Sequence, residues 1–106
     1  MIYKVIVTLE AKRNLRDAYL FIRRDSADAA SRWSKGARRS IRALGRFPAR
    51  CPIAPEGHAL DAPIRELLYG SGNRGTYRIL FVIVDNTVFG LHVRHGSMQP
   101  LPSNDS

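Results

Sequence analysis

The chain has 106 residues, a length that supports one hydrophobic core but not two. Its single cysteine, Cys51, excludes an internal disulfide, no Cys/His spacing matches a metal site, and no apolar run approaches the ~20 residues of a membrane span. Seventeen Lys and Arg against nine Asp and Glu give a net charge of +8, which is typical of proteins that bind nucleic acid or an acidic partner. The N-terminus is not a secretory signal, so we expect a cytoplasmic protein without metal or other cofactor.

The first half of the chain predicts one strand and two helices. Residues 2–7 form an apolar, β-branched run, and Thr8 is a suitable N-cap for a helix over residues 9–24. Residues 25–26, Asp-Ser, break this helix and cap a second one over roughly residues 27–46. We expect the two helices to form a hairpin that lies on one face of a sheet.

The second predicted helix carries two stripes of side chains that point in nearly opposite directions. The apolar stripe consists of Ala30, Trp33, Ala37, Ile41 and Leu44. The basic stripe consists of Arg32, Lys35, Arg39, Arg42 and Arg46. We therefore expect the apolar stripe to contact the sheet, and the basic stripe to be a solvated outer face rather than a ridge that binds a polyanion.

The second half of the chain predicts three strands. Residues 48–63 contain four prolines and are expected to be a long linker. Residues 64–69 read as a strand, residues 70–75 as a glycine-rich turn, and residues 76–95 as a hairpin around the two-residue turn Asp85-Asn86.

Arg78 interrupts the apolar first strand of this hairpin. A guanidinium in the centre of a sheet is costly unless an anion meets it, and few acids occur in the hairpin, so we expect that anion to come from outside the chain. A two-residue turn places Arg78 opposite Val93 and on the same face as His95, whereas a three-residue loop would place Arg78 opposite Arg94. The alternative interpretation is an exposed sheet end that carries charge.

Five short segments together match one known family. They are Asp-Ala-Ala at 28–30, Phe-Pro at 47–48, Ile-Arg-Glu-Leu at 64–67, Gly-Thr-Tyr-Arg-Ile-Leu-Phe at 75–81 and Leu-His-Val-Arg-His-Gly at 91–96. In these segments, and in the order of its predicted elements, the chain resembles toxins of the RelE/ParE superfamily from bacterial type II toxin–antitoxin modules. The resemblance implies a toxin domain over residues 1–98, followed by a flexible C-terminal tail over residues 99–106.

The resemblance also implies an α+β fold with a four-stranded, mostly antiparallel sheet. An N-terminal strand and a helical hairpin precede a three-stranded antiparallel run, and the helices cover one face. Both faces of residues 76–84 are apolar, which requires cover on each side. In this family a disordered, acidic segment of the cognate antitoxin commonly wraps the toxin, and we expect it to cover the second face.

Two mechanisms occur in this superfamily. RelE-like members cleave mRNA in the ribosomal A site, whereas ParE-like members inhibit DNA gyrase and are not known as nucleases. Because the family's site residues are partly retained, the sequence favours ribosome-associated mRNA cleavage by a metal-independent endoribonuclease. The alternatives are ParE-like inhibition of gyrase, or a degenerate toxin that only binds nucleic acid or its antitoxin.

The resemblance assigns the candidate catalytic roles. Arg78 matches the family's sheet arginine and would clamp phosphate, His95 lies near the position of a catalytic residue and would transfer a proton, and Glu66 or Glu56 could be the base. The predicted phosphate-binding residues are Arg65, Arg74, Arg78 and Arg94. The chain departs from nuclease members in having no C-terminal tyrosine and no lysine pair near the strand at residues 64–69, which weakens the prediction of cleavage.

Overall fold

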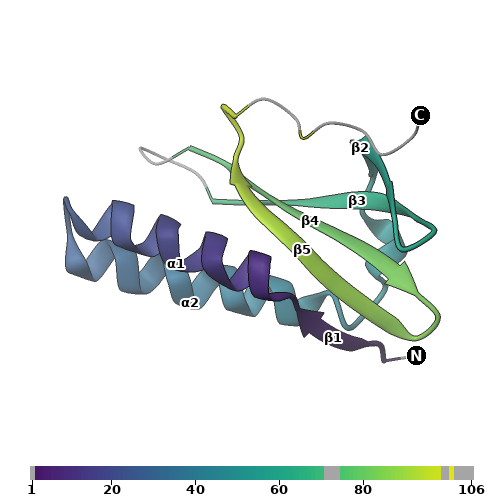
Figure 1. Cartoon of the computed structure of the whole chain (residues 1–106). Coiled ribbons are helices and arrows are strands. Elements are labelled where there is room, and N and C mark those ends of the chain that lie inside the picture. Colours follow the sequence, from purple (N-terminus) through teal and green to yellow (C-terminus); the bar gives the residue numbers. More distant parts are fainter. Residues whose placement is uncertain (1, 71–74, 99–100, 102–106) are drawn as a thin grey trace.

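The computed structural model describes residues 2–70, 75–98 and 101. Its elements are β1 (Lys4–Val7), α1 (Leu9–Arg23), α2 (Ala27–Ala43), the short 3₁₀ helix η1 (Pro48–Arg50), β2 (Ile53–Ala59), β3 (Ala62–Tyr69), β4 (Tyr77–Val84) and β5 (Thr87–His95). The predicted α+β class and element order are confirmed, and the two helices lie side by side beneath the sheet (Figure 1). The sheet has five strands, not the predicted four, in the order β1-β5-β4-β3-β2. Only the β1–β5 pair is parallel within the described residues.

The extra strand, β2, comes from the segment that the sequence predicted to be a linker. It pairs with β3 through Ile53↔Arg65 and His58↔Pro63, and the register shifts between these two pairs. Its one proline, Pro55, is tolerated because β2 is an edge strand, where a missing N–H need not break a ladder. The linker prediction was wrong because prolines and a glycine are unusual in a strand. The strand is recognised only from its pairing with β3.

Both helices begin at the predicted caps. Thr8 Oγ1 accepts a hydrogen bond from Ala11 N–H, and Ser26 Oγ accepts one from Ala29 N–H. These contacts satisfy backbone donors that have no partner inside the helix. Each helix ends slightly before its predicted boundary.

The helices cover one face of the sheet with the apolar stripe predicted for α2. On this face β4 contributes Tyr77, Ile79 and Phe81, all buried. The buried α2 side chains are Ala29, Ala30, Trp33, Ala37 and Ile41, followed by Leu44 at its C-cap. The basic stripe is exposed along its whole length, so the predicted orientation of α2 is confirmed.

A glycine in α2 allows close contact with the sheet. Tyr69 Oη donates a hydrogen bond to the Trp33 carbonyl oxygen at 3.0 Å, and the Trp33 ring packs edge-on against the rings of Tyr69 and Tyr77. A Cβ on Gly36 would collide with the Tyr69 hydroxyl. Gly36 therefore costs helix propensity but makes room for this aromatic cluster.

The second face of the sheet is covered by the chain itself. On β4, Leu80 and Val82 are fully buried there, against Ala54 of β2 and Ile64 of β3. Leu101 lies against the same cluster. The expectation that an outside segment covers this face was therefore wrong, because β2 supplies the cover that a four-stranded sheet would lack. The rest of the predicted tail, residues 99–100 and 102–106, lies outside the described residues.

The β4–β5 hairpin has the predicted two-residue turn, with Val84 opposite Thr87. Beyond that point one extra residue enters β5, because Phe81 faces Gly90 whereas Leu80 faces His92. This bulge shifts every later pair by one residue.

Among the described helices, none is both long and apolar enough to cross a membrane.

Candidate functional site

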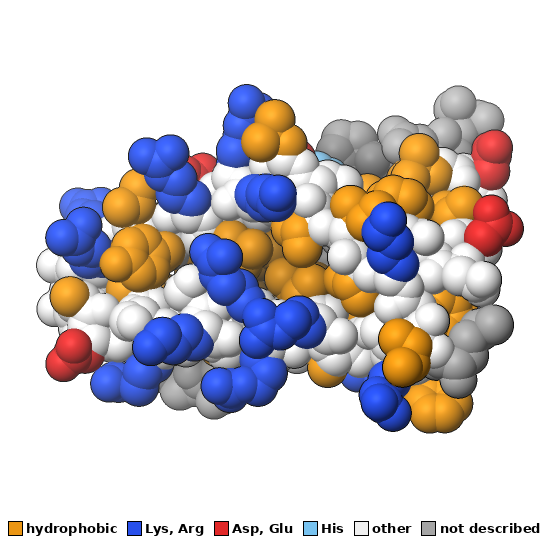
Figure 2. Space-filling model, turned by 90° about the horizontal axis from the view of Figure 1, so that it is seen from below, with side chains coloured by type: hydrophobic (Ala, Val, Ile, Leu, Met, Phe, Trp, Pro, Cys, Tyr) orange, Lys and Arg blue, Asp and Glu red, His pale blue; other side chains and the backbone are white. Residues whose placement is uncertain are grey.

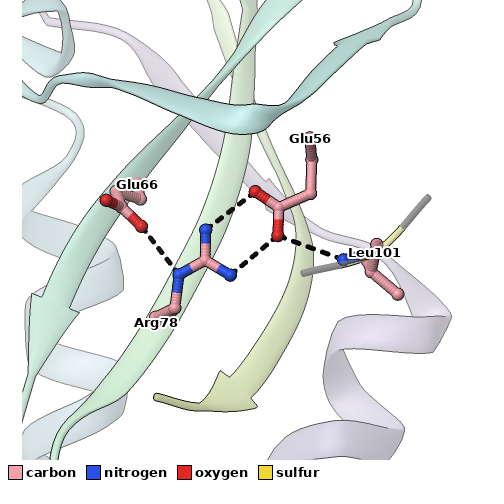
Figure 3. A network of polar contacts seen from close by, with 4 residues as sticks. All are labelled: Glu56, Glu66, Arg78 and Leu101. Carbon is pink, nitrogen blue, oxygen red and sulfur yellow. Dashed lines mark hydrogen bonds and ion pairs between the residues drawn. The ribbon is translucent and has the colours of Figure 1, made fainter. Parts of the chain in front are cut away.

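Arg78 is held by two carboxylates of its own chain (Figure 3). Its Nη1 and Nη2 donate to the two carboxylate oxygens of Glu56, each at 2.7 Å, and its Nε donates to Glu66 Oε1 at 2.7 Å. Glu56 is 1% exposed and also accepts a hydrogen bond from the Leu101 N–H at 3.3 Å. The prediction that the anion comes from outside was wrong, because the missed strand β2 carries Glu56 to the guanidinium.

The pKa values of this cluster favour the charged forms. The hydrogen bonds from Arg78 lower the pKa of Glu56 despite the opposing effect of burial. The hydrogen bond to Glu56, and then that to Glu66, raises the pKa of Arg78. Two carboxylates against one guanidinium leave the cluster with a formal charge of −1. Removing one partner of such a buried pair leaves the other charge unpaired in the interior.

His95 lies on the opposite face of the sheet from Arg78. The bulge in β5 places Arg78 opposite Arg94, and Tyr77 opposite His95. Neighbouring residues of a strand point to opposite faces, so the predicted shared face of Arg78 and His95 was wrong. The pairing of Arg78 with Arg94 is the one expected for a longer loop, but a bulge produces it here.

The His95 ring is oriented by contacts on both sides. It packs edge-on against Tyr77, with 5.0 Å between the ring centroids. Its Nδ1 lies 2.7 Å from Ser97 Oγ and accepts a hydrogen bond from the Ser97 N–H at 3.1 Å. Because Nδ1 accepts a backbone hydrogen bond, the neutral ring carries its proton on Nε2. The Nε2 atom lies next to Gly75, where a Cβ would be only 2.9 Å away.

The other predicted residues are divided between the two faces. Glu66 and Glu56 join Arg78, and Arg94 is its cross-strand neighbour. Arg65 donates instead to the carbonyl oxygens of Ala49 and Cys51, at 3.2 and 2.7 Å, and so fixes η1 against β3. Arg74 lies outside the described residues.

A hollow of about 500 Å³ lies between α1 and the end of β5. His95, Arg94 and Tyr77 line it together with Phe21 of α1 and Met98. Both Phe21 and Met98 are more than half exposed. The sequence analysis missed Phe21, although this aromatic residue lies off the face of α1 that buries Ala11, Leu15 and Ile22, which was a usable signal.

Comparison with known proteins identifies the class to which this fold belongs. The family model for the ParE toxin of the type II toxin–antitoxin system, parDE, matches residues 5–100. The chain thus belongs to the ParE toxin family, within the predicted RelE/ParE superfamily, and it is a toxin of a type II toxin–antitoxin system.

Two solved structures cover nearly the whole chain. The chromosomal ParDE toxin–antitoxin system from P. aeruginosa has 13% sequence identity and a TM-score of 0.66, over 89% of this chain and 96% of that one. The RelBE2 toxin–antitoxin complex from Mycobacterium tuberculosis has 28% identity and a TM-score of 0.48, over 90% and 99% of the two chains. The first similarity supports the fold. No match was found among curated proteins.

Proposed function

We propose that this toxin arrests growth by binding DNA gyrase, without cleaving RNA, and that a cognate antitoxin neutralises it. The observation that carries the proposal is the position of Arg78, which is bound by two carboxylates and lies on the opposite face of the sheet from His95. The sequence favoured mRNA cleavage, and this geometry is the reason to prefer the alternative.

Metal-independent RNA cleavage needs a base, a cation that holds the phosphate, and an acid, all within reach of one phosphodiester. Here the nearest groups to Arg78 are Glu56 and Glu66, whose charges repel a phosphate. His95 would have to act from the other side of the sheet. A toxin that acts by occupying a protein surface needs no such convergence of groups.

The antitoxin part of the proposal is supported by membership in the ParE toxin family and by the similarity to the chromosomal ParDE toxin–antitoxin system from P. aeruginosa. The net charge of +8 suits an acidic partner.

Ribosome-associated mRNA cleavage is the second candidate. It is favoured by the hollow that His95 and Tyr77 line, since an imidazole there can meet a ligand that enters between α1 and the end of β5. In this case the functional nuclease site would lie on the helix side of the sheet and would not use Arg78.

Induction of the toxin in bacterial cells, followed by mapping of mRNA 5′ ends and of plasmid supercoiling, separates the two candidates. We expect altered plasmid topology and an unchanged pattern of mRNA 5′ ends. The His95→Ala variant is the matched control and should arrest growth as the original chain does. New 5′ ends that appear with the original chain and vanish with His95→Ala would overturn the proposal in favour of cleavage.

A further inference from the structure

Phe47 is an exposed aromatic residue in a strained backbone conformation. Its φ and ψ angles, 48° and 51°, lie in the left-handed region, and the residue is 75% exposed. This region is costly for a bulky residue, and the proline that follows restricts the backbone of Phe47 further. Because the ring is so exposed, it gains little packing energy that could offset the cost.

The chain holds the strained backbone of Phe47 in place. The Phe47 carbonyl oxygen accepts hydrogen bonds from the Arg50 backbone N–H at 3.1 Å and from Arg50 Nη1 at 3.0 Å. The same Nη1 atom donates to the Arg46 carbonyl oxygen at 2.9 Å, and Pro48 is fully buried. Arg46 also forms an isolated β-bridge with Ile2. The ring is therefore presented to solvent by a backbone that is fixed before any partner arrives.

The turn explains the backbone of Phe47 but not its side chain. Glycine or asparagine adopts the left-handed conformation at lower cost than phenylalanine does. An aromatic side chain is thus the expensive choice at this position, and strain of this kind clusters at functional sites. Aromatic residues on a rigid backbone are typical anchors of protein–protein contacts, since little conformational entropy is lost when the ring enters a pocket.

The surroundings of Phe47 indicate the kind of partner that would take the ring. Ile2, which is paired with Arg46, is 71% exposed, so a second apolar side chain is available beside the turn. Residues 42–50 contain three arginines, all exposed, and no Asp or Glu. On the helical side of the molecule, Figure 2 likewise shows hydrophobic side chains exposed among charged ones that are mostly Lys and Arg. An apolar pocket with an acidic rim complements such a surface.

We infer that Phe47 anchors the toxin to its protein target. The ring fills an apolar pocket of the target, Ile2 contacts the edge of this pocket, and acidic side chains on the rim meet Arg46 and Arg50. A nucleic acid fits less well, because a base could stack on the ring but the phosphates offer nothing to Ile2. Naming gyrase as the target rests on the proposed function, whereas the anchoring role of Phe47 does not.

Leu60 provides a matched control for a test of this role. It is also apolar, 59% exposed and left-handed, with a φ of 54°, and it lies in the turn between β2 and β3. Phe47→Asn and Leu60→Asn both remove an exposed apolar side chain, and both variants should unfold at a temperature no lower than the original chain does, since asparagine tolerates this conformation. At equal cellular levels, we expect Phe47→Asn to lose growth arrest and Leu60→Asn to keep it. Purified Phe47→Asn should bind gyrase at least about thirtyfold more weakly than the original chain does.

Phe47→Leu distinguishes a pocket on a protein from a nucleic-acid base. Leucine already adopts the left-handed conformation at Leu60, and it can fill an apolar pocket but cannot stack on a base. We therefore expect Phe47→Leu to arrest growth far more strongly than Phe47→Asn does.

Four results would overturn the inference. They are full growth arrest by Phe47→Asn, equal loss of arrest in Phe47→Asn and Leu60→Asn, equal loss in Phe47→Asn and Phe47→Leu, and an unfolded Phe47→Asn variant, which would make the ring part of the structure. Failure of the original chain to bind gyrase would instead overturn the proposed function. Growth arrest would still decide the role of Phe47 in that case, because it is measured without reference to any particular target.

Discussion

The two faces of the β-sheet are stabilised by different physical means. The face beneath the helices is closed by aromatic and aliphatic packing around Trp33, Tyr77 and Phe81. The other face has a smaller apolar cluster and, beside it, the ion-paired Arg78 and Glu56. A cation within an apolar strand is therefore not in itself a sign of a ligand site, because a distant segment of the same chain can supply its anion.

The largest expected effect is the loss of the Arg78 guanidinium. Arg78→Ala leaves the buried Glu56 carboxylate without its partner, so the free energy of unfolding should fall by about 3–5 kcal/mol. Urea unfolding measures this change. If the anion came from outside the chain, as the sequence analysis expected, the variant would keep its stability. A variant as stable as the original chain would therefore return Arg78 to the role of a residue that binds an outside anion.

The dependence of the free energy of unfolding on pH should also distinguish the two faces of the sheet. The pKa of Glu56 is lowered from its ordinary value of 4.5 by Arg78, so its contribution is present above that pH and is lost as the pH falls through the lower folded value. Burial lowers the pKa of His92 from 6.5, so stability also declines below that pH for a separate reason.

Unfolding measured across this pH range in Arg78→Met with Glu56→Leu should lack the lower of the two declines. Phe81→Ala should lose about 3–5 kcal/mol at every pH and keep both declines, because it removes only packing on the helix side. Identical pH profiles for the double variant and the original chain would contradict the assignment to Glu56.

Gly36→Ala tests how closely the helix side is packed. An alanine normally favours a helix by about 1 kcal/mol over glycine, but here its Cβ meets the Tyr69 hydroxyl. We expect a net loss of about 1–2 kcal/mol in thermal or urea unfolding, since overpacking a well-filled site is costly. The loss should shrink in a Tyr69→Phe background, and a stabilised Gly36→Ala variant would show that the contact is easily relieved.

The smallest effect is expected on the outer face of α2. Arg32→Glu with Arg39→Glu should change the free energy of unfolding by no more than about 0.5 kcal/mol per substitution, because both side chains are exposed. A thermal melt suffices for this comparison. Loss of the folded state would mean that the basic stripe contributes to the structure after all.

Local patterns in the sequence predicted much of the helix side. Thr8 and Ser26 mark helix starts through contacts that span three residues, and the apolar stripe of α2 follows helical periodicity. The turn at residues 85–86 is equally local. Features of this kind are encoded within a few residues of where they occur.

The other face depends on contacts that no local pattern encodes. Glu56 reaches Arg78 across 22 positions of the sequence, from a strand whose proline and glycine are typical of a linker. The bulge at Leu91 directly follows Gly90, and a glycine inside a strand can mark a bulge, but the sequence does not fix the resulting register, and this bulge alone separates His95 from Arg78. The family was recognisable from the sequence, but the arrangement of the candidate site was not.

Growth arrest by the Arg78→Met, Glu56→Leu double variant tests the central claim that Arg78 is architectural. Replacing both members of a buried ion pair with apolar side chains of similar size is often neutral for stability, so this variant should fold where Arg78→Ala is weakened. With folding verified by urea unfolding, we predict that its induction arrests growth as strongly as induction of the original chain. A folded double variant that no longer arrests growth would contradict the account and make Arg78 part of the toxic site.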